Sequence, residues 1–101
     1  MVKEYILCAA IYYKIDKVIA HQPKNIDKGI VICGRRHHNC IPISMYLQIK
    51  KGTQHIQGFL TNTDRFVDRT EAAKIAIAAG QTKNTKLIKD KEPCLISEDL
   101  Y

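Results

Sequence analysis

Three apolar stretches of the chain have the pattern expected of β-strands. Residues 5–13, 30–33 and 55–61 are rich in β-branched and aromatic side chains and are bounded by polar or glycine-containing segments. Such runs are typical of buried or half-buried strands. A shorter apolar run at 17–21 predicts another strand, joined to the first by a hairpin through 14–16. The N-terminal half therefore predicts an antiparallel sheet.

The clearest helical pattern lies at 69–79, after a turn at 62–65. Asp68 is a good N-cap, and Glu71 stands three residues further on, as in a capping box. Gly80 supplies a C-terminal stop. Apolar residues recur at helical spacing on one face, at Ala72, Ile75, Ala76 and Ala79. These mostly small side chains suit close packing of the helix on a sheet.

Residues 40–49 carry two conflicting patterns. Every second residue is apolar, which favours a strand: Ile41, Ile43, Met45, Leu47 and Ile49. A helix would also have an apolar face, made by Ile41, Met45, Tyr46 and Ile49. Asn39 can cap such a helix, Pro42 falls in its first turn, and Lys50-Lys51-Gly52 makes a good stop. The alternation favours the strand, and the helix stays open as the alternative.

The C-terminal part predicts an edge strand around 86–88 and a docked segment at 94–101. Taken together, the patterns predict an α+β fold. We expect a small antiparallel β-sheet with two short helices packed on one face, the second helix being the alternative at 40–49. With 101 residues, the chain is expected to form a single domain, 1–101. A core this small is marginal, which makes self-association plausible.

The composition, 46% hydrophobic and 26% charged, is that of a globular protein. The chain contains no run of eighteen apolar residues, so we expect no membrane span. Its start, MVKEYILCAAIYY, lacks the order of charged, apolar and small residues found in a signal peptide. We therefore expect a cytoplasmic protein. Its four cysteines should then be reduced, with Cys8 and Cys33 as buried small hydrophobes.

The formal net charge of +6 favours anionic partners. The lysines are scattered through the predicted loops, whereas Arg35, Arg36, Arg65 and Arg69 fall in two short motifs. Arginine suits bidentate recognition of phosphate. The sequence therefore favours the arginines over the lysines as candidate ligand-binding residues.

Arg65 and Arg69 stand at the start of the predicted helix 69–79. Cations at a helix N-terminus oppose the helix dipole by about 0.3–1 kcal/mol each. Free N–H groups at the same place bind anions readily. The arginines therefore predict an anion site here. The alternative is that Arg65 pairs with Asp64 or Asp68, and Arg69 with Glu71.

If 40–49 is helical, the motif GRRHHN repeats this arrangement. A second helix start would then follow Arg35, Arg36, His37 and His38, and the two starts would suit a ligand with two phosphates. Asn39 and Asn62 could bind base or ribose edges. Phe59 and Tyr46 offer flat apolar surface for an adenine. The candidate ligand-binding residues are Arg35, Arg36, His37, Asn39, Phe59, Asn62, Arg65 and Arg69.

Other chemistry is less well supported. Cys33, His37, His38 and Cys40 are possible zinc ligands, but their spacing matches no common zinc motif, and Cys33 is expected to point into the sheet. A nucleophilic pair of Cys40 and His38 is disfavoured, because close sequence neighbours seldom have the required geometry. Both histidines also suit simple surface positions. We expect no metal, no cofactor and no catalytic residues.

Three segments resemble the Thoeris anti-defence protein 1 family of phages: GRRHHNC, QGFLTNTDRFVDRTEAAKIAIAAGQ and the closing LISEDLY. The resemblance covers residues 30–101. It implies a non-enzymatic protein that binds cyclic ADP-ribose variants made by bacterial TIR-domain enzymes, without cleaving them. Some family members also trap cyclic oligonucleotides, and they assemble as dimers or larger oligomers. The resemblance favours a helix at 40–49 and implies binding roles for Arg35, Arg36, Phe59, Asn62, Arg65 and Arg69.

The resulting hypothesis is a single nucleotide-binding domain that sequesters a cyclic nucleotide signal in the cytoplasm of the host bacterium. The expected partners are this small molecule and further copies of the chain, in a homodimer or higher homo-oligomer, with no membrane and no nucleic acid. Two alternatives remain: a nucleotide pyrophosphate hydrolase using His37 or His38, and a small basic nucleic-acid-binding module.

Overall fold

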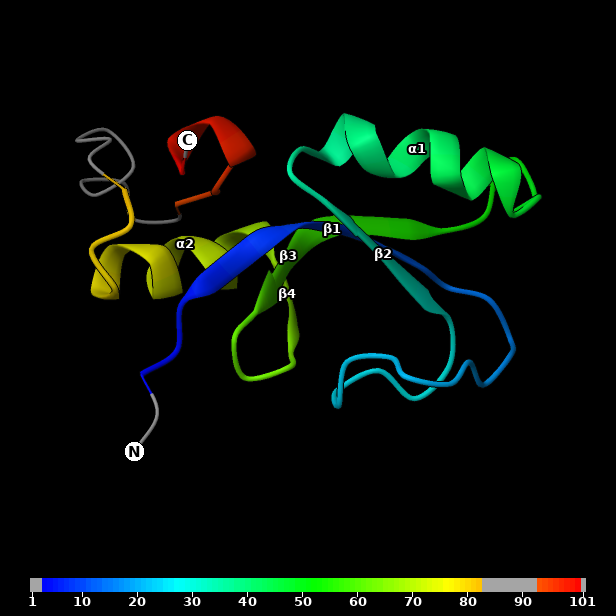
Figure 1. The fold of residues 1–101 in the computed structure, drawn as a ribbon, viewed down its shortest axis with the longest axis horizontal. Helices are drawn as coiled ribbons and strands as arrows, with labels where there is room; N and C mark the ends of the chain where they lie inside the picture. The colour runs from blue at the N-terminus through cyan, green and yellow to red at the C-terminus, as the bar shows by residue number, and fades with distance from the viewer. Residues whose placement is uncertain (1–2, 83–92, 101) are drawn as a thin grey trace.

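Four antiparallel strands form one sheet in the computed structural model, which describes residues 3–82 and 93–100 (Figure 1). The strand order is β2-β1-β3-β4. The bounds are Ile6–Tyr13 for β1, Ile30–Gly34 for β2, His55–Thr61 for β3 and Phe66–Asp68 for β4. The three strands predicted at 5–13, 30–33 and 55–61 are confirmed. With only three residues, β4 was too short to give a periodic signal.

The strand predicted at 17–21 is wrong, because residues 14–29 form a loop without a strand. Polar side chains of this loop bind both edges of the sheet. Gln22 Oε1 accepts a 2.7 Å hydrogen bond from the Val31 N–H of β2. Asn25 accepts from the Phe66 N–H at 2.8 Å and donates to the Phe66 carbonyl at 2.7 Å, beside β4. These hydrogen bonds satisfy N–H and C=O groups on the two edge strands, which would otherwise be open to pairing with a further strand.

The same loop covers one face of the sheet. The Tyr12 ring meets the Phe66 ring edge-on, with centroids 5.7 Å apart. The Tyr12 hydroxyl donates to the Lys28 carbonyl at 2.7 Å, and Pro23 is buried. In Figure 1 the loop lies below the strands, on the side away from α1. The single chain thus covers the face that its helices leave open.

Residues His37–Tyr46 form α1, so the helical alternative holds and the strand favoured by alternation is wrong. The helix begins three residues before the predicted segment. Asn39 Oδ1 accepts a 2.9 Å hydrogen bond from the Arg36 N–H and so stabilises the helix start. The buried residues are Cys40 and Ser44, which share one helical face. The helix ends before Gln48, whose φ of 59° lies in the left-handed region, rather than at Gly52.

Residues Arg69–Ala78 form α2, as the capping pattern predicts. Asp68 Oδ1 accepts a 2.8 Å hydrogen bond from the Glu71 N–H. Gly80 has a φ of 71° and ends the helix, which its sequence position predicted. The buried residues are Ala72, Ala73 and Ala76, so the face in contact with the sheet is turned slightly from the predicted one. Alanine lets the helix lie close to the strands.

Both helices pack on the same face of the sheet. The β1 residues Ala9, Ile11 and Tyr13 alternate onto this face. Ala9 belongs to a core cluster with Phe59 and α2, while Ile11 and Tyr13 belong to a second cluster with Cys40 of α1. The α+β fold with two short helices on one face is therefore confirmed.

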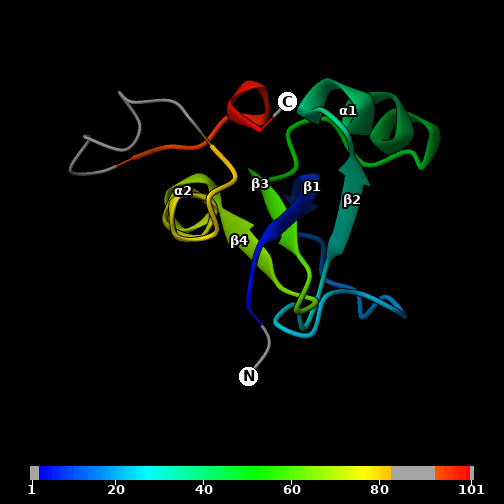
Figure 2. The same cartoon turned by 60° about the vertical axis from the view of Figure 1, so that its left-hand side comes forward.

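The C-terminal segment docks between the two helices, as Figure 2 shows. Leu95 is fully buried, and its N–H donates to the Arg69 carbonyl at 3.0 Å. Residues Ser97–Asp99 form a 3-10 turn, η1. The predicted docking of this segment is confirmed for 94–100. The edge strand predicted at 86–88 lies outside the described residues.

Candidate functional site

The starts of α1 and α2 meet at the middle of β3. The His37 Nε2–H donates to the Gly58 carbonyl at 2.8 Å. Arg69 Nη2 donates to Gln57 Oε1 at 2.5 Å. The structure therefore brings His37 and Arg69 close together, and the sequence predicted both as ligand-binding residues. Chain connectivity explains this, because α2 follows directly on β4, whose Asp68 pairs with Gly58.

The His37 ring also packs edge-on against Phe59, with centroids 5.1 Å apart. Burial lowers the pKa of His37, and the nearby Arg69 guanidinium lowers it further, outweighing the Gly58 hydrogen bond that favours the protonated form. A neutral ring with its N–H on a backbone carbonyl is held in one orientation. This geometry suits a structural contact between α1 and β3 better than a general base.

The C-terminal segment occupies the space beside this meeting point. Arg36 Nη1 lies 3.4 Å from the Glu98 carboxylate and 3.4 Å from the Ser97 hydroxyl. Arg69 Nε is buried without a hydrogen-bond partner among the described residues. Arg36 is thus paired with the chain's own acidic tail, and Arg69 is engaged with Gln57 of β3.

Arg65 and Asn62 lie elsewhere, where the β3–β4 turn meets the N-terminal strand. Arg65 Nε and Nη2 donate to Glu4 at 2.9 and 2.7 Å, and Nη2 also donates to Glu71 at 3.1 Å. The alternative of local pairs is therefore not what forms: Arg65 pairs with Glu4 and Glu71 instead of Asp64 or Asp68, and Arg69 bonds Gln57 instead of Glu71. Asn62 accepts from the Tyr5 N–H at 2.7 Å and donates to the Lys3 carbonyl at 2.9 Å. Both side chains hold the start of the chain in place.

Three further predicted residues have different surroundings. Phe59 is 0% exposed, so its ring is a core element and cannot stack on a ligand in this conformation. Asn39 is engaged in the start of α1, as described above. Arg35 is exposed on the turn between β2 and α1. The eight predicted residues are thus divided between two regions, and they do not line one common hollow.

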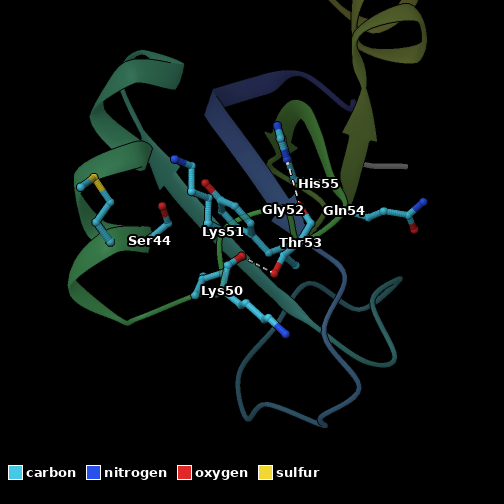
Figure 3. A pocket seen from close by; sticks show the side chains of 10 residues that line it. Ser44, Lys50, Lys51, Gly52, Thr53, Gln54 and His55 are labelled. Atoms are coloured by element: carbon cyan, nitrogen blue, oxygen red, sulfur yellow. Dashed lines mark hydrogen bonds between the residues drawn. The ribbon is translucent and has the colours of Figure 1, made fainter.

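A cavity of about 710 Å³ lies instead at the other end of α1 (Figure 3). Met45, Ile49 and Tyr13 give it an apolar lining. Lys50 and Lys51 line it from the loop that joins α1 to β3, and His55 lines it from the first position of β3. Pockets of about 300–1,000 Å³ with an apolar lining and a few polar groups are typical of small-molecule sites.

The loop that carries the lysines is held by local hydrogen bonds. The Thr53 hydroxyl and the Thr53 N–H both donate to the Lys50 carbonyl, at 2.5 and 3.1 Å. Gly52 has a φ of 91°, which glycine adopts without strain. The rings of Tyr13 and His55 lie 5.7 Å apart, because these residues pair across β1 and β3. Lys50 and Lys51 thus share the lining of the cavity with an aromatic and apolar surface.

Sequence patterns alone do not predict this cavity. Lys50 and Lys51 fit the stop predicted for a helix at 40–49. A signal was present, since two adjacent lysines, a glycine and a histidine occur within six residues. Only the pairing of Tyr13 with His55 adds the aromatic surface that completes the site.

A second cavity, of about 520 Å³, adjoins the Arg65 network. Its lining includes Lys3, Glu4, Arg65, Glu71 and Lys74. The carboxylates here already neutralise Arg65, which makes this cavity the weaker candidate for an anion.

The cysteines do not support a metal site. All four are free thiols, and no group of three potential ligands from His, Cys, Asp and Glu occurs in residues 3–82 and 93–100. Cys33 is exposed and Cys8 half-buried, so the prediction that both are buried is wrong. Their thiols contact one another across β1 and β2. The hydrogen bond between them lowers the pKa of Cys8 to about 7 and raises that of Cys33.

The chain is similar to a known family of proteins. The family described as phage T4 y16D protein matches residues 5–101. This chain belongs to the phage T4 y16D protein family. No curated protein and no solved structure matches the chain. The y16D match establishes that the chain belongs to a family of phage proteins.

No helix within residues 3–82 and 93–100 is both long enough and apolar enough to cross a bilayer.

Proposed function

We propose that this phage protein binds and sequesters a small anionic nucleotide signal, of the cyclic ADP-ribose type, in the cavity at the end of α1. The observation that carries the proposal is the lining of this cavity, in which Lys50, Lys51 and His55 stand beside Tyr13. A cyclic ADP-ribose variant has a pyrophosphate, two riboses and an adenine. The ammonium groups would hold the phosphates, and the apolar lining would hold the base.

The lysines replace the arginines as the proposed phosphate ligands. Arg36, Arg65 and Arg69 each have contacts within the chain. A ligand would have to displace those contacts, and the cost would reduce its affinity. Lys50 and Lys51 are exposed at the cavity, so a phosphate can reach them without breaking an ion pair.

We further propose that the protein does not cleave its ligand. The hydrolase alternative relied on His37 or His38. The His37 N–H is engaged with the Gly58 carbonyl, and its pKa is lowered by burial. Neither histidine lines the proposed cavity. This geometry supports binding over hydrolysis.

Calorimetric titration with cyclic ADP-ribose and its linkage isomers tests the site. The Lys50→Ala/Lys51→Ala double variant should lose two charge-assisted hydrogen bonds, worth about 1.5–3 kcal/mol each. Since every 1.4 kcal/mol is tenfold, the expected loss is about 10²–10⁴-fold in affinity. The matched control is Lys17→Ala/Lys24→Ala, which removes the same charge from two exposed positions in the loop 14–29.

The control variant should bind as the unchanged protein does. An equal loss of affinity in both variants would show a general charge effect and would contradict the proposed site. Absence of binding to every isomer would contradict the proposed ligand class. Cyclic oligonucleotides, titrated in the same way, test whether the protein takes a second class of signal.

Release of the ligand distinguishes binding from catalysis. The protein is incubated with the tightest isomer and heat-denatured, and the supernatant is analysed by mass spectrometry. Intact ligand supports sequestration, whereas a hydrolysed product supports the enzyme. For the nucleic-acid alternative, DNA binding is measured against salt concentration, and a steep decrease would favour that function.

A further inference from the structure

Two cysteines lie next to one another on the face of the sheet that the helices leave open. Ala9 and Ile11 of β1 pack towards the helices, so Cys8 and Ala10 alternate onto the other face. Ala10 is directly opposite Cys33 of β2, and residues opposite one another in a strand pair share a face. Cys8 and Cys33 are therefore diagonal neighbours across the two strands, and their thiols are hydrogen-bonded.

This pair of thiols is accessible to small solutes. Cys33 is exposed and Cys8 is half-buried. The loop 14–29 covers the same face further along the strands, where Tyr12 contacts Phe66 and the Lys28 carbonyl. A reagent as small as hydrogen peroxide can therefore reach the two sulfurs without unfolding the sheet.

The two thiols differ in acidity. The hydrogen bond from the Cys33 thiol lowers the pKa of Cys8 to about 7, although burial acts in the opposite direction. The same contact raises the pKa of Cys33, and burial raises it further. At neutral pH about half of Cys8 is then thiolate, which is the nucleophilic form, while Cys33 keeps its proton. One thiol is suited to attack an oxidant, and the other is held beside it.

We propose that Cys8 and Cys33 form a reversible redox site, at which hydrogen peroxide converts the two thiols into a disulfide that links β1 to β2. In the first step the Cys8 sulfur attacks one peroxide oxygen, so that an S–O bond forms, the O–O bond breaks and hydroxide leaves. In the second step the Cys33 sulfur attacks the Cys8 sulfur, so that the S–S bond forms and the S–O bond breaks. The departing hydroxide takes the Cys33 proton and leaves as water. The two sulfurs together lose two electrons, and the peroxide gains them.

The place of the pair in the sheet makes this disulfide easy to reduce again. Diagonal neighbours across two strands have Cα atoms about 7–8 Å apart, whereas disulfides usually need about 4.4–6.8 Å. Closing the bond therefore moves the backbone, which β2 permits because it is an edge strand of the described sheet. Strained and exposed disulfides are the labile ones, and disulfides of cytosolic proteins are usually transient.

Peptide mapping by mass spectrometry tests the redox site. Trypsin places the four cysteines in four different peptides, 4–14, 29–35, 37–50 and 92–101. The reduced protein is treated with a small excess of hydrogen peroxide at pH 7, and the remaining thiols are blocked with iodoacetamide. We expect peptide 4–14 linked to peptide 29–35, and dithiothreitol should separate the two again. The peptides of Cys40 and Cys94 should be recovered mainly in the alkylated form.

Two variants separate the roles of the cysteines. Cys33→Ala should stop the reaction at a sulfenic acid on Cys8, which dimedone traps, and should slow the oxidation of Cys8 several-fold at pH 7. The matched control is Cys94→Ala, which removes an exposed thiol outside the pair. This control should form the link between Cys8 and Cys33 at an unchanged rate.

Three results in the unchanged protein would overturn the proposal, and they need no variant to fold. The first is a Cys8 that stays reduced while Cys94 is oxidised. The second is a Cys8 that reaches sulfinic or sulfonic acid without a link to Cys33. The third is a link that joins Cys94 to either cysteine, or one chain to another, as often as it joins Cys8 to Cys33. No ligand takes part, so the proposed function is judged separately.

Discussion

Substitution of Glu4 by glutamine should measure how strongly the start of the chain is tied to the β3–β4 turn. The Glu4 carboxylate accepts hydrogen bonds from Thr61 at 2.9 Å, from Thr63, and from two nitrogens of Arg65 at 2.9 and 2.7 Å. The bonds join residues 57 to 61 positions apart. Glutamine keeps the size of the side chain and removes its charge.

The expected magnitude follows from the titration of this carboxyl. The hydrogen bond from Arg65 is the largest cause that lowers the pKa of Glu4, from 4.5 to about 2. By linkage, such a shift corresponds to at most about 3 kcal/mol of stability. The Glu4 and Arg65 side chains are 24% and 32% exposed, so solvent screens part of the attraction between them and lowers this upper bound. We expect Glu4→Gln to cost about 1–2 kcal/mol at pH 7.

The sign of the pH dependence is also determined. A carboxyl whose pKa is lowered on folding stabilises the protein above the unfolded pKa, here 4.5. That contribution disappears as the pH falls from about 4.5 towards about 2. The difference in stability between the two proteins should therefore be largest at neutral pH and should shrink through this range.

Urea unfolding at several pH values measures this difference. The control is Asp16→Asn, which removes the ion pair between Asp16 and Lys28. The Asp16 side chain is 91% exposed and the Lys28 side chain 57% exposed. This exposed pair should contribute about 0–1 kcal/mol. A Glu4→Gln protein as stable as the original at pH 7, or a difference that does not change with pH, would refute the network as a source of stability.

Two further predictions concern the sheet. Gly58→Ala should destabilise the fold by about 1–3 kcal/mol or more, seen as a lower melting temperature, because a Cβ would lie 2.8 Å from the Phe66 ring and closer still to the β4 backbone; an unchanged melting temperature would contradict this packing. Alkylation of Cys8 by iodoacetamide should reach half its maximal rate near pH 7, since the thiol of Cys33 stabilises its thiolate. Replacing Cys33 by alanine should move that midpoint towards pH 9, with the exposed Cys94 as internal reference in peptide mass spectra, and an unmoved midpoint would exclude the thiol contact.

Local signals carried most of the prediction of the fold. The strand runs at 5–13, 30–33 and 55–61 and the capped helix at 69–79 were predicted correctly. Each of these elements can be recognised from residues that lie next to one another in the sequence. The Asp68 cap on the Glu71 N–H, for example, spans three residues. The helix–sheet arrangement followed from these elements.

Competing local signals needed long-range contacts to resolve them. Residues 40–49 alternate as a strand does, yet they form α1, whose Cys40 packs in the core with Ile11 and Ile32 of the sheet. Gly34 leaves room for the start of this helix, because a Cβ there would lie 2.9 Å from Asn39. The apolar run at 17–21 stays in a loop whose Gln22 and Asn25 bind the two edges of the sheet.

The sequence by itself determined the α+β composition, the start of α2 and the excess of positive charge. Only the tertiary structure decided which cations remain available, because Glu4 and Glu98 reach Arg65 and Arg36 from sixty residues away. It also decided where the cavity forms, since Tyr13 and His55 meet only when β1 pairs with β3. Sequence patterns record neighbours along a helix or strand, whereas ion pairing and cavity shape depend on distances that exist only after the chain has packed.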